Sequence, residues 1–173
     1  GGCQYVSYLI RWLRLHPIKQ EVKILTDIGN GRAVHDALKL AGELKIPMRV
    51  GVDAKSIEGI EVYPWSERLQ CEMMKECKAA IDVKGEEDFN QKYKPATKAQ
   101  KYVGSGIPFA VNSGSYSQEY FANRKFQVCS PADTRRWFSE PYWEETIKIG
   151  ELVRKETSIE SVGRKFKEII DRL

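Results

Sequence analysis

The chain is poor in the residues that build metal centres and disulfide frameworks. Its 173 residues include two histidines and four cysteines, and no two cysteines have the C-x-x-C spacing of zinc and redox sites. The cysteines are Cys3, Cys71, Cys77 and Cys129. We therefore expect no metal site and interpret the cysteines as buried free thiols, which are typical of a reducing compartment.

Long apolar runs and a strong net charge are also missing. No stretch approaches the length of a membrane-spanning helix, and the N-terminus lacks the uninterrupted apolar core of a signal peptide. We expect a cytoplasmic protein. The 28 basic and 24 acidic residues are mixed along the chain and give a net charge of +4, which is too weak to indicate a nucleic-acid partner.

Sequence motifs of several enzyme classes are absent as well. There is no Walker loop and no nucleophile elbow, and the run Gly29–Val34 lacks the spacing of a dinucleotide fingerprint. We interpret that run as a turn between a strand and a helix. The alternative is that one of its backbone amides faces a phosphate. No cofactor is therefore expected.

The sequence instead alternates short β-type runs with helical periodicity. The predicted strands are residues 22–26, 47–52, 60–62, 79–83, 107–111 and 126–129. The predicted helices cover 3–16 and 32–44, begin near Ser66, Lys94, Ser117 and Ser130, and continue as a tail from Pro141 with a break near Thr157. This order predicts an α/β fold with an open, Rossmann-like parallel sheet of about six strands and helices on both faces.

Residues 21–173 are predicted to form one domain, preceded by an amphipathic helix and linker over residues 1–20. Val6, Leu9, Ile10 and Leu13 form the apolar stripe of that helix. Such a stripe is expected to dock on its own domain. Contact with a membrane surface or with a missing partner domain is the alternative.

Ligands of open parallel sheets bind beyond the carboxyl ends of the strands. The residues predicted there are 27–31, Asp53, 63–66, 84–88, 112–115 and Ser130. Lys94, Lys98 and Lys101 are expected on one helix face beside the small, polar loop Asn112–Ser115, a combination that suits a phosphate or a nucleotide diphosphate. The alternative is that these lysines form an ordinary solvated helix face.

Trp65 and Ser66 follow the third predicted strand. Ser66 is a good N-cap for the next helix. The Trp65 ring either stacks on the base or ring of a ligand or fills the edge of the core.

The stretch from Ile60 to Glu119 resembles a known family. A strand ending in P-W-S, the A-A-I-D-V strand, K-P-x-x-K-x-x-K-Y-x-x-x-G-I-P-x-x-V and a Ser/Gly loop followed by Glu119 look like the C-terminal half of a GT-B fold glycosyltransferase. The resemblance extends more weakly from Val22 to the C-terminus. It implies a Rossmann-like domain that binds a nucleotide-sugar donor, with a separate, missing N-terminal domain for the acceptor.

By position, the resemblance assigns roles to individual residues. Donor and phosphate binding falls on Lys94, Thr97, Lys98, Asn112, Ser113, Gly114, Ser115 and Glu119, and the surroundings of the base and sugar on Trp65, Ser66 and Lys101. It implies a metal-independent sugar transfer, in which lysine and helix N–H groups stabilise the leaving diphosphate. The absence of an Asp-x-Asp pair agrees with this.

The sequence also departs from the family. Many retaining members carry two glutamates eight residues apart, and this chain has Tyr93 and Lys101 at the matching positions. A non-catalytic interaction domain that kept the half-fold and lost the site is therefore the alternative to a transferase.

Overall fold

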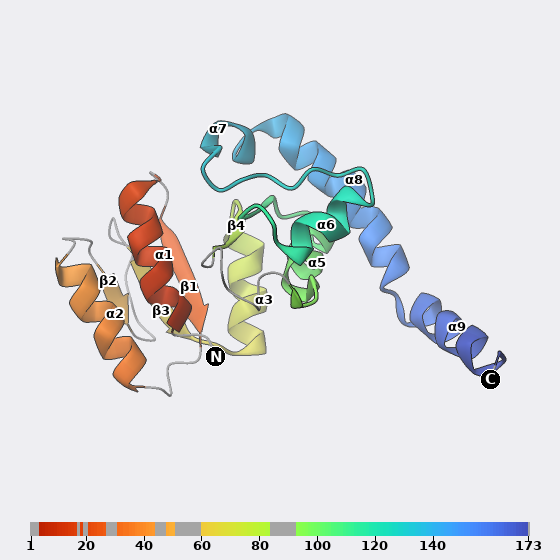
Figure 1. Ribbon diagram of the computed structural model, residues 1–173, viewed down its shortest axis with the longest axis horizontal. Coiled ribbons are helices and arrows are strands. Elements are labelled where there is room, and N and C mark those ends of the chain that lie inside the picture. The colour runs from red at the N-terminus through yellow and green to blue at the C-terminus, as the bar shows by residue number, and fades with distance from the viewer. Residues whose placement is uncertain are drawn as a thin grey trace. The chain divides into compact units, whose positions relative to one another are not determined.

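The computed structural model describes residues 4–16, 18, 21–26, 31–43, 48–50, 60–83 and 93–172 (Figure 1). The chain divides into two compact units. The first comprises Gly1–Glu76 and Val83–Gly85, and the second comprises Cys77–Asp82 and Glu86–Leu173. The boundary expected between residues 20 and 21 stays a prediction.

The first unit contains a parallel sheet of three strands in the order β1-β3-β2. Its elements are α1 (Gln4–Leu15), β1 (Val22–Thr26), α2 (Gly31–Glu43), β2 (Met48–Val50), β3 (Ile60–Pro64) and α3 (Glu67–Glu76). Ile60 and Val62 lie two residues apart on the central strand and so share one face of the sheet. They form a buried cluster with Val6, Ile10 and Leu13 of α1 and Ala41 of α2. The apolar stripe of α1 therefore packs within this unit.

The second unit contains a parallel pair of strands and most of the helices. Its elements are β4 (Ala80–Asp82), α5 (Thr97–Gly104), β5 (Phe109–Val111), α6 (Tyr116–Ala122), α7 (Thr134–Trp137), α8 (Glu140–Glu156) and α9 (Ile159–Ile170). Helices α5 and α8 pack closely because Gly150 has no side chain. A Cβ atom at Gly150 would collide with the carbonyl oxygen of Val103.

The predicted parallel α/β architecture is confirmed, but the prediction of one sheet of about six strands is wrong for the described residues. These residues form one sheet of three strands and one of two. The predicted strand 126–129 contributes only a bridge between Cys129 and Ala110. The N–H of Phe126 donates to the carbonyl of Phe121, and that of Cys129 donates to the Tyr142 hydroxyl. These two N–H groups are therefore not available for the strand-to-strand hydrogen bonds that a strand over residues 126–129 would need.

Two helices begin later than predicted. Helix α5 begins at Thr97, not near Lys94, because Pro95 disfavours helical backbone at the residue before it. Lys94 therefore lies outside the helix, and the predicted face of three lysines is reduced to Lys98 and Lys101. Helix α7 begins at Thr134, since Asp133, and not Ser130, caps it by accepting from the N–H of Arg136.

The break predicted in the tail is confirmed: α8 ends at Glu156, and Ser158 is the N-cap of α9. The thiol prediction is confirmed for Cys129, which is buried. Cys77 is partly buried. Cys71 is exposed on α3, so the prediction of a buried thiol is wrong for this residue. Cys3 lies outside the described residues.

Candidate functional site

The carboxyl ends of the strands in the second unit meet at one edge of the sheet. Asp82, the last residue of β4, is in register with Val111, the last residue of β5, and the two strands are parallel. The N–H of Val111 donates to the carbonyl of Cys129, which lies in a parallel bridge beside β5. Asp82, Asn112 and Ser130 therefore leave the sheet at the same edge, which we call the carboxyl edge.

Helix α5 starts at this edge. A short turn connects its last residue, Gly104, to β5, so the helix runs opposite to the strand and its first turn lies near the strand's carboxyl end. An ion pair between Lys98 Nζ and Asp82 Oδ1, at 3.9 Å, is consistent with this placement. The Lys98 side chain is 61% exposed and the Asp82 side chain 19%.

The first turn of α5 carries no side-chain cap from Ala96, the residue at the N-cap position. Its amides and the Lys98 ammonium thus provide positive potential at the carboxyl edge. Thr97 is exposed in this turn, and Lys94 is exposed just before it. Lys101 lies in the last turn of α5, farther from the carboxyl edge than Lys98.

The loop after β5 is used partly to start α6. Ser115 is buried, and its hydroxyl accepts from the N–H of Gln118 at 3.2 Å. Gly114 has a φ of +73°, and its N–H donates to Gln118 Oε1 at 2.9 Å. Asn112 is partly buried and Ser113 is exposed. Two of the predicted ligand-binding residues therefore have a structural role as well.

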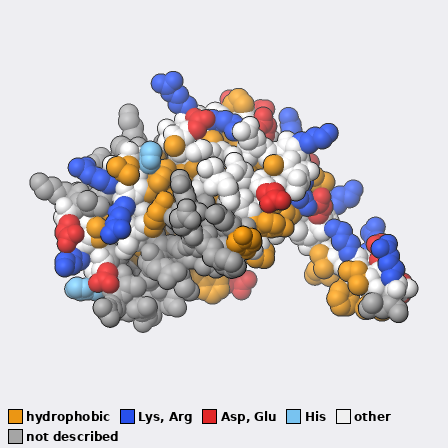
Figure 2. All heavy atoms as spheres, viewed as in Figure 1, with side chains coloured by type: hydrophobic (Ala, Val, Ile, Leu, Met, Phe, Trp, Pro, Cys, Tyr) orange, Lys and Arg blue, Asp and Glu red, His pale blue; other side chains and the backbone are white. Residues whose placement is uncertain are grey.

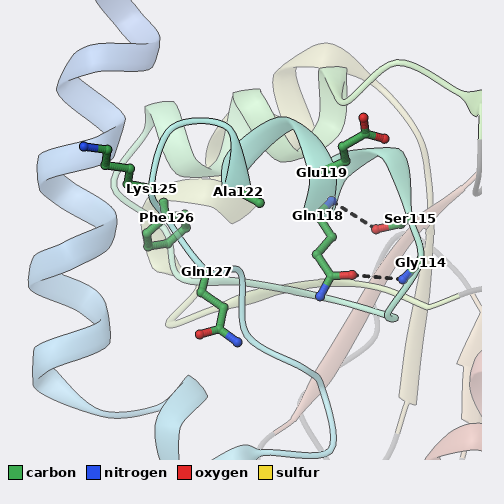
Figure 3. Close-up of a pocket in the computed structure, with 8 residues that line it drawn as sticks. All are labelled: Gly114, Ser115, Gln118, Glu119, Ala122, Lys125, Phe126 and Gln127. Carbon is green, nitrogen blue, oxygen red and sulfur yellow. Dashed lines mark hydrogen bonds between the residues drawn. The ribbon is translucent and has the colours of Figure 1, made fainter.

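A pocket of about 560 Å³ lies beside α6 (Figure 3). Its lining residues are Gly114, Ser115, Gln118, Glu119, Ala122, Lys125, Phe126 and Gln127. Gly114, Ser115 and Glu119 were predicted from the sequence, whereas Gln118, Lys125 and Gln127 were not. The polar run 123–125 after the predicted helix is the sequence signal that points to Lys125, which has an unusual φ of +59°. The lysines at the start of α5 do not line this pocket.

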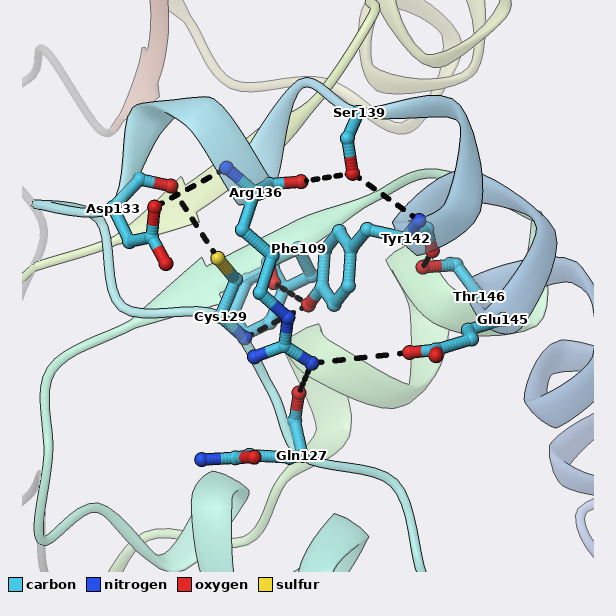
Figure 4. A network of polar contacts seen from close by, with 9 residues as sticks. All are labelled: Phe109, Gln127, Cys129, Asp133, Arg136, Ser139, Tyr142, Glu145 and Thr146. Carbon is cyan, nitrogen blue, oxygen red and sulfur yellow. Dashed lines mark hydrogen bonds and ion pairs between the residues drawn. The ribbon is translucent and has the colours of Figure 1, made fainter.

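A buried polar network links α8 to β5 and to Cys129 beside it (Figure 4). The Tyr142 hydroxyl donates to the carbonyl of Phe109 at 2.6 Å and accepts from the N–H of Cys129 at 2.9 Å. Burial raises the pKa of Tyr142 well above its usual range, and it raises that of the Cys129 thiol to about 11. Both groups are therefore neutral near pH 7 and act as parts of the scaffold.

Trp65 and Ser66 belong to the first unit. The Ser66 hydroxyl accepts from the N–H of Leu69 at 3.1 Å and caps α3, as predicted. The Trp65 side chain is exposed, and its Nε1 donates to Gln70 Oε1 at 3.2 Å. Their predicted place near a ligand's base stays a prediction. The predicted strand-end residues 27–30, Asp53 and 84–88 lie outside the described residues.

Within the described part of the chain, no three His, Cys, Asp or Glu side chains are grouped so that they could hold a metal ion. No helix in that part is both long and apolar enough to cross a bilayer. No protein-family model, curated protein or solved structure matches the chain.

Proposed function

We propose that the carboxyl edge of β4 and β5 binds the diphosphate of a nucleotide-sugar and that the chain is the Rossmann-like donor half of a GT-B glycosyltransferase. The observation that supports this most directly is the convergence of Lys98, the first turn of α5 and the loop Asn112–Ser115 at one edge. Parallel sheets bind ligands at such edges.

The proposed chemistry is metal-independent sugar transfer from the donor to an unidentified acceptor. Lys98 and the first amides of α5 would stabilise the charge that develops on the leaving diphosphate. Gly114 exposes backbone without a side chain, so a phosphate or sugar can approach the loop closely. Glu119 lines the adjoining pocket and is placed to accept hydrogen bonds from sugar hydroxyls. Lys94 and Lys101 add positive charge to this surface, and Thr97 adds a hydroxyl group in the first turn of α5.

The test is thermal stability of the full chain against UDP, GDP, ADP, CMP and their sugar conjugates, because a ligand that binds only the folded state raises the melting temperature. We expect one nucleotide diphosphate to stabilise the protein, with and without a chelator. Lys98→Ala should weaken the binding of that nucleotide by about 1–2 kcal/mol. Lys148→Ala is the matched control, since Lys148 is exposed on α8.

A non-catalytic interaction domain is the second candidate. It is favoured because residues of the proposed site already interact with each other within the protein. Lys98 pairs with Asp82, and the Gly114 N–H and the Ser115 hydroxyl form hydrogen bonds with Gln118 at the start of α6. This candidate predicts no stabilisation by any nucleotide or nucleotide-sugar. An equal loss of affinity in Lys98→Ala and Lys148→Ala would also contradict the proposed phosphate contact.

A further inference from the structure

Helix α9 presents an apolar face that the described residues do not cover. None of its residues is buried. Its large apolar side chains are Ile159, Val162, Phe166, Ile169 and Ile170, with exposed fractions between 53% and 88%. Figure 2 shows hydrophobic side chains gathered on one side of this C-terminal helix and basic side chains on the other.

The helix is well defined by its own ends. The Ser158 hydroxyl accepts from the N–H of Ser161 at 3.2 Å, and the N–H of Asp171 donates to the carbonyl of Lys167. Capping of this kind favours the helical form of the segment. A layer that covers the apolar face would stabilise this 12-residue helix further.

Three basic side chains of α9 lie at the edges of this face. At about 100° per residue, Lys165 and Arg172 lie along one edge of the apolar face and Lys167 along the other, where Glu160 lies next to it. The side of the helix away from the apolar face carries charges of both signs: Arg164, Glu168 and Asp171. Long basic side chains at both edges can extend their ammonium and guanidinium groups sideways while their methylene stems stay on the apolar surface. The face thus suits an apolar layer with negative charges on both sides.

A second copy of α9 fits this pattern poorly. Ile159, Val162, Phe166 and Ile169 occupy heptad core positions, which places Lys165 and Arg172 at the same flanking position of successive heptads. In an antiparallel pair these two cations would face each other, and in a parallel pair they would face the glycine or isoleucine at the other flank. Two heptads are also shorter than stable coiled coils require.

We propose that α9 binds an anionic membrane surface, lying in the plane of the interface with its apolar face among the acyl chains. The apolar arc and the basic side chains along its edges are features of an interfacial amphipathic helix. The lysines and Arg172 would contact lipid phosphates at the level of the headgroups. This surface is separate from the carboxyl edge, and the proposal does not depend on nucleotide binding.

The experiment is co-sedimentation of the full chain with vesicles of phosphatidylcholine alone or of phosphatidylcholine and phosphatidylglycerol in a ratio of about three to one. We expect binding to the anionic vesicles that weakens with salt. Phe166→Ser should lower the partition coefficient about tenfold. Trp143→Ser, at a similarly exposed apolar residue of α8, is the control and should bind as the unaltered chain does.

A second pair of variants tests the charge pattern. Lys165→Glu should weaken binding about fivefold or more, whereas Arg164→Glu makes the same charge change on the far side and should have a smaller effect. We expect each variant to fold, because the substituted side chains are exposed. Circular dichroism and melting curves check this. Equal effects of the two charge reversals would contradict the proposed orientation.

Failure of the folded chain to bind anionic vesicles overturns the proposal. A concentration-dependent dimer, or a complex with another protein, that is lost in Phe166→Ser while vesicles do not bind would assign the face to a protein surface instead.

Discussion

The Tyr142 hydroxyl lies 2.6 Å from the carbonyl oxygen of Phe109, across 33 residues of sequence, and links the start of α8 to the first residue of β5. The same oxygen accepts the N–H of Cys129, and the tyrosine ring stacks on Phe126. One side chain thus replaces part of the ladder that residues 126–129 would otherwise make. Tyr142 therefore joins α8 to β5 and to the segment 126–129.

Tyr142→Phe should destabilise the protein by about 1–3 kcal/mol, because it leaves a buried N–H and a buried carbonyl without their partner and keeps the ring in place. Chemical denaturation measures this free energy. Tyr116→Phe is the control, since Tyr116 is exposed on α6 and should change stability little. Equal stability of the two variants would mean that water or backbone movement replaces the lost bonds.

Gly150→Ala should destabilise the protein by about 1–3 kcal/mol or more, because the added methyl group forces α8 away from the Val103 carbonyl of α5. Gly163→Ala provides a matched comparison within α9. A Cβ atom there meets nothing within 4 Å, so the substitution should instead stabilise by up to about 1 kcal/mol through helix propensity. Melting curves of the two variants should therefore shift in opposite directions. A shift in the same direction would contradict the close packing of α5 and α8.

Much of the element order could be predicted, because local signals determine it. Runs such as Val22–Thr26 and Ile60–Val62 carry β-branched residues between turn signals, and the structure has strands there. Ser66 was likewise predictable as the cap of α3, and the break near Thr157 was predictable from the helical spacing on its two sides. The sequence pattern predicts the start of α5 too early, because Pro95 disfavours helical backbone at Lys94.

The parts that could not be predicted depend on contacts between distant residues. No local pattern indicates that Tyr142 takes the N–H of Cys129 and so limits a strand to one bridge. Helical periodicity predicted α9 but not that its apolar face would be exposed. In the site, the order of strands and helices predicts that Lys98 and Asn112 lie near one edge of the sheet. The hydrogen bonds by which Ser115 and Gln118 cap α6 are known only from the structure.

Stability should fall at alkaline pH because of Cys129. Burial raises the pKa of its thiol to about 11 in the folded protein, against about 8.5 for an unfolded cysteine. Above the unfolded value the unfolded chain releases this proton while the folded chain keeps it, so the stabilising contribution is present below about pH 8.5 and is lost as the pH rises toward 11. The raised pKa of Tyr142 acts in the same direction at higher pH.

Denaturation curves at several pH values test this. Cys129→Ala should be less stable at neutral pH because it leaves a cavity, and its stability should decline less steeply between about pH 8.5 and 11. Cys71→Ala is the control, because Cys71 is exposed. If the slope is the same in both variants, Cys129 does not carry the alkaline transition.

Asp82 should oppose ligand binding if the carboxyl edge receives a diphosphate. Its carboxylate lies 3.9 Å from the Lys98 ammonium, so an incoming phosphate must share that cation or displace the carboxylate. Asp82→Asn removes the competing charge and keeps the side chain's size. We expect it to tighten nucleotide diphosphate binding several-fold, while Lys98→Ala weakens it. Titration calorimetry with the nucleotide selected by the thermal screen measures both constants, and Asp171→Asn, at the exposed end of α9, controls for net charge. Weaker binding in Asp82→Asn would show instead that Asp82 holds Lys98 in its binding position, and equal effects of Asp82→Asn and Asp171→Asn would mean that only the overall charge matters.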